Sequence, residues 1–77
     1  MYNGWTNYET WNVNLWATNE EPIYRHLLQL KPFTACSAES TAREIYPDGT
    51  PDMLSGRTDG MEAVNWQEIA NTWNELD

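Results

Sequence analysis

The stretch that decides the fold covers residues 6–18 and reads TNYETWNVNLWAT. Its first four letters fit a capping box, in which the Thr6 hydroxyl accepts a hydrogen bond from a backbone amide and the Glu9 side chain reaches back. The large apolar residues are spaced as one face of a helix, and they are Tyr8, Trp11, Leu15 and Trp16. We predict a helix over residues 7–18 that turns this stripe toward a core, with Asn12 off the stripe.

The next segment, residues 20–30, carries a second helix signal. The stretch from Thr18 to Glu21 repeats the capping box, and Pro22 is tolerated in a first turn because the amide that it lacks would have no partner inside the helix. The residues expected to face the core are Ile23, Leu27 and Leu30, with Tyr24 and Leu28 beside them. Pro32 disfavours any continuation, and the short link to the first helix implies an antiparallel or sharply angled pair.

Two more helices are predicted toward the C-terminus. One begins at Thr34 or Ser37 and reaches Tyr46, and its small alanines permit close packing. The other opens with Asn65 as its cap and runs to Leu76. Its apolar seam consists of Trp66, Ile69, Ala70, Trp73 and Leu76.

The segment between these two helices is rich in turn residues. Pro47, Gly49 and Pro51 end the third helix, and residues 52–60 are predicted to form a loop with room for one helical turn. A short strand at residues 61–64 is an alternative for the next segment, although it has no obvious partner.

These features predict a single all-α domain over residues 1–77, a small bundle of about four short helices. A domain of this size depends on a few large buried side chains, and this chain has five tryptophans. Trp5 precedes the first cap, so we expect it to pack back near Thr10 or Trp11. The tryptophans expected in the interior are Trp11, Trp16, Trp66 and Trp73.

The charge balance narrows the classes of partner. Twelve acidic residues against four Lys and Arg give a net charge of -8, which disfavours direct binding to nucleic acid or to an anionic membrane. A charged partner is therefore expected to be basic, unless the acidity serves only to keep an aromatic-rich protein soluble. Neither a secretory signal nor a membrane-spanning stretch is recognisable, and Cys36 is the single cysteine, so we expect a cytoplasmic protein.

The residues that usually carry chemistry do not form a recognisable site. His26 and Cys36 are the single His and Cys, no nucleophile motif surrounds them, and they are too few for a zinc site. Residues 48–59 imitate a calcium loop, but Met53 replaces its required glycine. No phosphate-binding glycine loop occurs, and base stacking by tryptophans would need a basic groove. The sequence predicts no catalytic site, no cofactor and no metal.

Two segments carry a resemblance to a known family. The first is residues 2–16, with the letters NYETWN, followed by Asn19, Glu20, Glu21 and Tyr24, and the second is residues 64–70, VNWQEIA. Both are similar to a family of small phage, plasmid and bacterial proteins without an assigned activity. The similar residues make up about a third of the chain, and residues 31–60 carry no resemblance. It implies a setting, because small acidic proteins of mobile elements often inhibit host defence, including anti-CRISPR and anti-restriction proteins.

We therefore hypothesise an inhibitor, acting in the host cytosol, that binds the basic nucleic-acid-binding surface of a host protein or nucleoprotein defence complex. The alternative is a structural or regulatory module that self-associates through exposed aromatic residues. The oligomeric state stays open. The carboxylates expected to bind the partner lie in the second and third helices and the turn after them, and they are Glu20, Glu21, Glu39, Glu44, Asp48 and Asp52.

Overall fold

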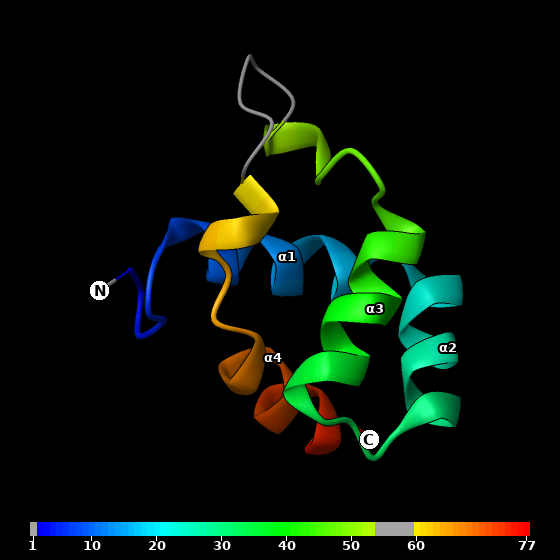
Figure 1. The fold of residues 1–77 in the computed structure, drawn as a ribbon. Helices are drawn as coiled ribbons and strands as arrows, with labels where there is room; N and C mark the ends of the chain where they lie inside the picture. The colour runs from blue at the N-terminus through cyan, green and yellow to red at the C-terminus, as the bar shows by residue number, and fades with distance from the viewer. Residues whose placement is uncertain (1, 54–59) are drawn as a thin grey trace.

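The structure is a computed structural model that describes residues 2–53 and 60–77. Within these ranges it is built of helices and contains no strand (Figure 1), so the predicted all-α class is confirmed. The elements in chain order are α1 (Tyr8–Asn19), α2 (Glu21–Leu30), α3 (Ala35–Ile45), the short 3-10 helices η1 (Pro51–Met53) and η2 (Gly60–Ala63), and α4 (Trp66–Asn74).

The segment between α3 and α4 differs from the prediction in part. The loop expected over residues 52–60 begins inside η1, and residues 54–59 lie outside the described ranges. The alternative of a strand at residues 61–64 is wrong, because η2 occupies most of that segment. The missing strand partner noted from the sequence is the physical reason.

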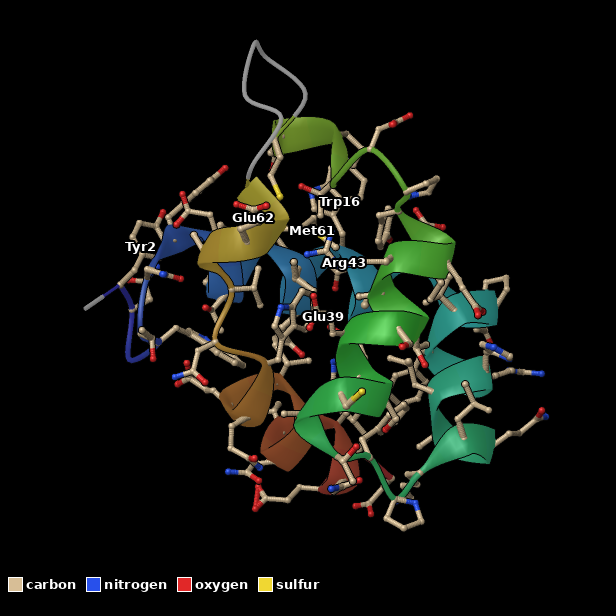
Figure 2. All side chains as sticks on the ribbon, in the orientation of Figure 1. Tyr2, Trp16, Glu39, Arg43, Met61 and Glu62 are labelled. Atoms are coloured by element: carbon tan, nitrogen blue, oxygen red, sulfur yellow. The ribbon has the colours of Figure 1, made fainter. Side chains whose placement is uncertain are left out.

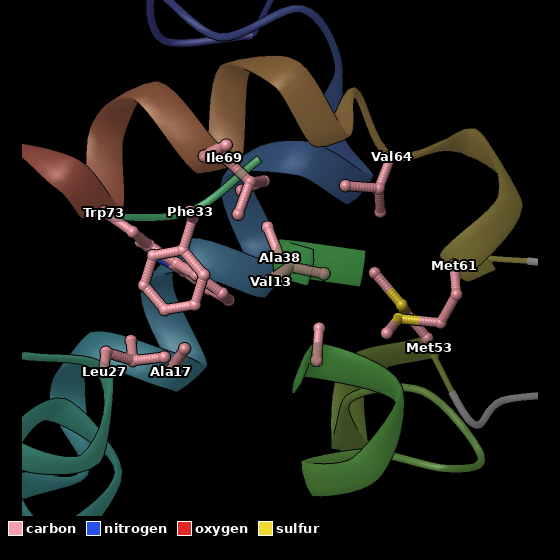
Figure 3. Close-up of a cluster of buried hydrophobic side chains, with 12 residues drawn as sticks. Val13, Ala17, Leu27, Phe33, Ala38, Met53, Met61, Val64, Ile69 and Trp73 are labelled. Atoms are coloured by element: carbon pink, nitrogen blue, oxygen red, sulfur yellow. The ribbon is translucent and has the colours of Figure 1, made fainter. Parts of the chain in front are cut away.

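The helices meet around α4. It packs most extensively against α3 and also contacts α1 and α2, while α1 contacts α2 and η2. The apolar interior between them contains Val13, Ala17, Leu27, Phe33, Ala38, Ala42, Met53, Met61, Val64, Ile69, Ala70 and Trp73. In Figure 3, Phe33 and Trp73 lie at one end of this core and the two methionines at the other.

Trp73 is the largest side chain that is fully buried. Its ring meets Phe33 edge-on at a centroid distance of 5.2 Å, and its indole Nε1 donates to Asn14 Oδ1 at 3.2 Å. A buried indole needs such an acceptor, since an unpaired N–H in an apolar core is costly. The interior position expected for Trp73 is confirmed, and Trp66 and Trp5 are half-buried and pack against the same core.

The face that α1 turns inward is not the predicted one. Tyr8 is exposed, and Trp11, Leu15 and Trp16 are only half-buried. The buried residues of α1 are Thr10, Asn12, Val13 and Ala17. Polar side chains can be buried where they form hydrogen bonds, and the spacing of apolar residues along a helix does not predict such burial. The interior positions expected for Trp11 and Trp16 are therefore wrong.

The first two helix starts also differ from the predicted capping boxes. The N-cap of α1 is Asn7, whose Oδ1 accepts from the Thr10 amide at 2.9 Å. Thr18 does not cap α2, because its hydroxyl donates to the Asn14 carbonyl at 2.7 Å. Glu20 stands at the start of α2 without a side-chain cap bond.

The other two starts follow the prediction. Thr34 and Ser37 form a reciprocal capping box at the start of α3. Asn65 caps α4 by accepting from the Glu68 amide at 3.1 Å. On α2, Leu27 is buried as expected, but Leu30 is 43% exposed because it is the last residue of its helix.

Candidate functional site

The polar residues at the start of α1 fasten it to the segment before α4. The Thr10 hydroxyl donates to Asn7 Oδ1 at 2.6 Å and accepts from the Asn65 amide at 2.9 Å. Asn7 Nδ2 donates to the Ala63 carbonyl at 2.7 Å. Two of these bonds join positions more than fifty residues apart, so Asn7 and Thr10 of the NYETWN stretch stabilise the fold.

Asn12 makes a second long-range link, to η1 and the residue before it. Its side chain is fully buried; Oδ1 accepts from the Thr50 hydroxyl, and Nδ2 donates to Asp52 Oδ2 at 2.7 Å. Trp16 Nε1 donates to the same Asp52 oxygen at 3.0 Å. The bonds from Asn12 and then Trp16 lower the pKa of Asp52, against a smaller opposing effect of desolvation. Asp52 is thus an ionised carboxylate in a fixed position.

Three aromatic rings gather near the start of α1, and one of them, Tyr8, is linked to this carboxylate through Asn12. The N-terminal aromatic cluster consists of Tyr2, Tyr8 and Trp11, with ring centroids 5.0 to 5.7 Å apart. Tyr2 and Tyr8 are 37% and 36% exposed, while Trp11 is half-buried. The cluster therefore presents aromatic surface to the solvent, at the edge of the molecule where Figure 2 labels Tyr2.

A tight turn holds Tyr2 in this cluster. Tyr2 and Trp5 exchange two backbone hydrogen bonds of 2.7 Å, and the residues between them, Asn3 and Gly4, both have positive φ. Positive φ at both central positions is typical of a type I′ turn, for which Asn-Gly is the preferred pair. This dipeptide is the sequence signal that would have predicted the turn and the pairing of Tyr2 with Trp5.

Tyr8 is linked to Asp52 through Asn12, because Asn12 Nδ2 lies 3.4 Å from the Tyr8 hydroxyl and also donates to Asp52. Desolvation raises the pKa of Tyr8, and electrostatic interactions with Asp52, Tyr2 and Glu9 raise it further. The two carboxylates among these neighbours, Asp52 and Glu9, make the surroundings of Tyr8 negative.

The structure brings four of the six predicted partner-binding carboxylates to one end of the molecule. Glu20 and Glu21 stand at the start of α2, and Glu44 and Asp48 stand at and just after the end of α3. Figure 1 shows these two helix ends on the same side of the molecule. Desolvation and then the charge of Glu20 raise the pKa of Tyr46, which places Glu20 near that ring. We call these four residues the α2–α3 acidic end.

The other two predicted carboxylates lie elsewhere. Glu39 accepts from Arg43 at 2.8 Å, and Figure 2 shows both on the side of α3 that faces η2. Glu44 lies five positions after Glu39, which places the two residues about 140° apart around the helix. Asp52 belongs to the network beside the aromatic cluster.

The basic side chains of the described ranges already have partners in the chain. Arg25 pairs with Glu21 at 2.6 Å, and Arg43 pairs with Glu39. Lys31 Nζ donates to the carbonyl of Leu76. Within residues 2–53 and 60–77, the carboxylates of Glu20, Glu44 and Asp48 have no basic partner.

The comparison with known families concerns the whole chain. Residues 1–77 match the family of unknown function DUF7249. The chain belongs to this family. No curated protein and no solved structure matches it. Because the DUF7249 description carries no activity, the match adds no chemistry to the geometry described above.

The residues of this DUF7249 member that were considered for catalysis or metal binding do not belong to the aromatic cluster or to the α2–α3 acidic end. Cys36 lies exposed on α3 and His26 lies exposed on α2. The described residues contain no group of three or more His, Cys, Asp or Glu able to hold a metal ion. Residues 54–59, which make up half of the calcium-like stretch, lie outside the described ranges. No helix within those ranges has the length and apolar character to cross a membrane.

Proposed function

We propose that this protein is an accessory protein of a mobile element that inhibits a host defence complex of the CRISPR or restriction type. It acts in the host cytoplasm, without chemistry of its own, by covering a basic surface on which the complex binds nucleic acid. The observation that carries the proposal is the α2–α3 acidic end, where exposed carboxylates stand without basic partners in the described part of the chain.

The end of α3 strengthens the negative potential of this surface, whereas the N-terminus of α2 weakens it beside Glu20 and Glu21. The C-terminus of α3 adds the partial negative charge of its free carbonyl groups beside Glu44 and Asp48. The pair of Glu21 with Arg25 is solvent-exposed, with 71% and 72% of the two side chains accessible. Such a pair contributes little stability, so Glu21 is available to a basic partner.

This charge pattern suits competition with nucleic acid. A defence complex holds phosphates with Arg and Lys, and carboxylates that reach the same side chains would displace them. Complementary charge accelerates association, and this acceleration becomes weaker as salt screens the charges. The whole-chain charge of -8 would also steer the protein toward such a surface.

The test uses purified CRISPR effector and restriction complexes and measures DNA binding by mobility shift. The variant Glu20→Gln/Glu44→Gln/Asp48→Asn removes three charges from the acidic end. The matched control Glu62→Gln/Glu75→Gln/Asp77→Asn removes three exposed charges elsewhere. We expect the unaltered protein and the control to block DNA binding at low salt and the acidic-end variant to fail. Equal blocking by both variants, or blocking by none, would contradict the proposal.

A second candidate function rests on the N-terminal aromatic cluster. Its exposed rings favour the module that self-associates through aromatic residues. Trp5 packs against the core, so Trp5→Ala would disturb the fold, and Tyr2→Ala is the better variant. Sedimentation supports this alternative if a salt-insensitive dimer is present and Tyr2→Ala abolishes it.

A further inference from the structure

We infer that the N-terminal aromatic cluster and Asp52 form a site for an arginine side chain of a partner protein. The inference deepens the proposed function and rests on it, because the partner surface is taken to be basic. It adds a second contact region, separate from the α2–α3 acidic end, with a preference for one basic residue type.

The arrangement of the rings favours a flat cation. Tyr2 and Tyr8 meet at 85° and Trp11 is tilted by 54° and 40° to them, with all three in contact. Rings that already touch leave no room between them to enclose a compact ammonium group. Their solvent-facing surfaces remain, and a planar guanidinium stacks on such a surface better than an ammonium group does.

The carboxylate supplies the second half of the site. Asn12 and Trp16 both bind Oδ2 of Asp52, so its other oxygen takes no part in these two bonds. Tyr8 lies next to this carboxylate through Asn12. An arginine that stacks on Tyr8 can therefore donate to Asp52 from the same guanidinium, and a carboxylate already held in place loses little freedom on binding.

The surrounding charge also favours a cation. Glu9 adds a second negative charge near Tyr8. The described basic residues Arg25, Lys31 and Arg43 are engaged elsewhere in the chain. The bases of a nucleic acid could stack on the same rings, but its backbone phosphates would be repelled by the carboxylates.

The test is a titration of the full chain with hexa-arginine and hexa-lysine peptides at equal salt, followed by the indole N–H signals in NMR spectra. The Trp16 indole binds Asp52, and the Trp73 indole binds Asn14 in the core, so they serve as reporter and internal control. We expect hexa-arginine to shift the Trp11 and Trp16 signals and to leave Trp73 unchanged. It should bind about two- to fivefold more tightly than hexa-lysine for each ring that it covers.

Variants separate the ring contribution from the charge. Tyr8→Leu should abolish the preference for arginine, and Tyr2→Leu, in the exposed turn, should reduce it without altering the Trp73 signal. Asp52→Asn should weaken both peptides, with Glu62→Gln as the control of equal charge. Equal affinity of the two peptides, binding that leaves the Trp11 and Trp16 signals unchanged, tighter binding of single-stranded DNA, or a dimer lost in Tyr2→Leu would overturn the inference.

The two proposals fail in different ways. If the acidic-end variant loses inhibition while hexa-arginine shows no preference, the proposed function stands and the arginine site is wrong. If hexa-arginine occupies the site but the protein blocks no defence complex, the proposed function is wrong and the site serves another basic partner.

Discussion

The aromatic cluster with Asp52 and the α2–α3 acidic end are both negative surfaces, but the fold holds them differently. Asp52 is fixed by hydrogen bonds from two α1 side chains. Glu20, Glu44 and Asp48 extend from helix ends and make no side-chain hydrogen bond within the described ranges. A fixed charge favours one partner geometry, whereas mobile charges provide attraction with little orientation. Loss of the hydrogen bonds that fix Asp52 should therefore destabilise the fold, whereas removal of a charge from the acidic end should change its stability only slightly.

The largest expected effect is that of Asn12→Ala. The change removes the partner of the buried Thr50 hydroxyl and one of the two donors to Asp52. We expect the free energy of unfolding to fall by about 2 to 4 kcal/mol. Denaturant titration measures it, and Asn19→Ala at the exposed end of α1 is the control, with a change within about 0.5 kcal/mol. A loss for Asn12→Ala no larger than that of the control would contradict the assigned network.

A smaller loss is expected for Thr10→Val, which keeps the shape of the side chain. The change removes the acceptor of the Asn65 amide and the donor to Asn7. The free energy of unfolding should fall by about 1 to 2 kcal/mol, because the partly buried Asn65 amide loses its acceptor. Thr41→Val on α3 provides the matched control in the same denaturant titration. Equal effects of the two substitutions would show that the link between α1 and α4 contributes little.

The contrast between local and distant bonds explains what sequence reasoning could find. Thr34 caps α3 through Ser37, three residues away, and Asn65 caps α4 through Glu68, so both starts were predictable from neighbouring letters. Asn12 is buried because of Thr50 and Asp52, 38 and 40 residues further along the chain. Hydrophobic spacing cannot reveal such partners, and it therefore selected the wrong face of α1.

The candidate sites divide in the same way. The gathering of Glu20, Glu44 and Asp48 depends on how α2 and α3 are placed by their packing against α1 and α4, and the spacing of these residues along the chain contains no sign of it. Asp52 was predicted as a partner-binding carboxylate, but its attachment to α1 depends on contacts between distant residues. The turn that pairs Tyr2 with Trp5, by contrast, follows from Asn3-Gly4, a local signal that hydrophobic patterning ignores.

At the acidic end, single substitutions should have small effects of opposite sign. Glu20 stands at the positive N-terminal end of α2, and Glu44 stands at the negative C-terminal end of α3. Glu20→Gln should lower the free energy of unfolding and Glu44→Gln should raise it, each by about 0.3 to 1 kcal/mol at low salt. Thermal unfolding at low and high salt measures both. Changes of the same sign, or changes that persist at high salt, would show that these residues are held by more than the helix ends.

The last expected effect is local and depends on pH. The hydrogen bonds of Asn12 and Trp16 hold the pKa of Asp52 below its ordinary value of 3.8. A carboxyl group whose pKa is lower in the folded state than in the unfolded state stabilises the fold at pH values above its unfolded-state pKa. That stability is lost as the pH falls through the folded-state pKa. Asp52→Asn should therefore be less stable than the unaltered chain at neutral pH, and the difference should disappear in acid.

The Trp16 indole signal follows this titration directly, since its N–H is bound to Asp52. We expect its midpoint to lie below 3.8 and the Trp73 signal to stay constant over the same range, because its acceptor Asn14 does not titrate. A midpoint at or above 3.8 would mean that α1 does not hold the carboxylate. The aromatic cluster would then face a mobile charge like those of the acidic end, and the distinction between the two surfaces would be lost.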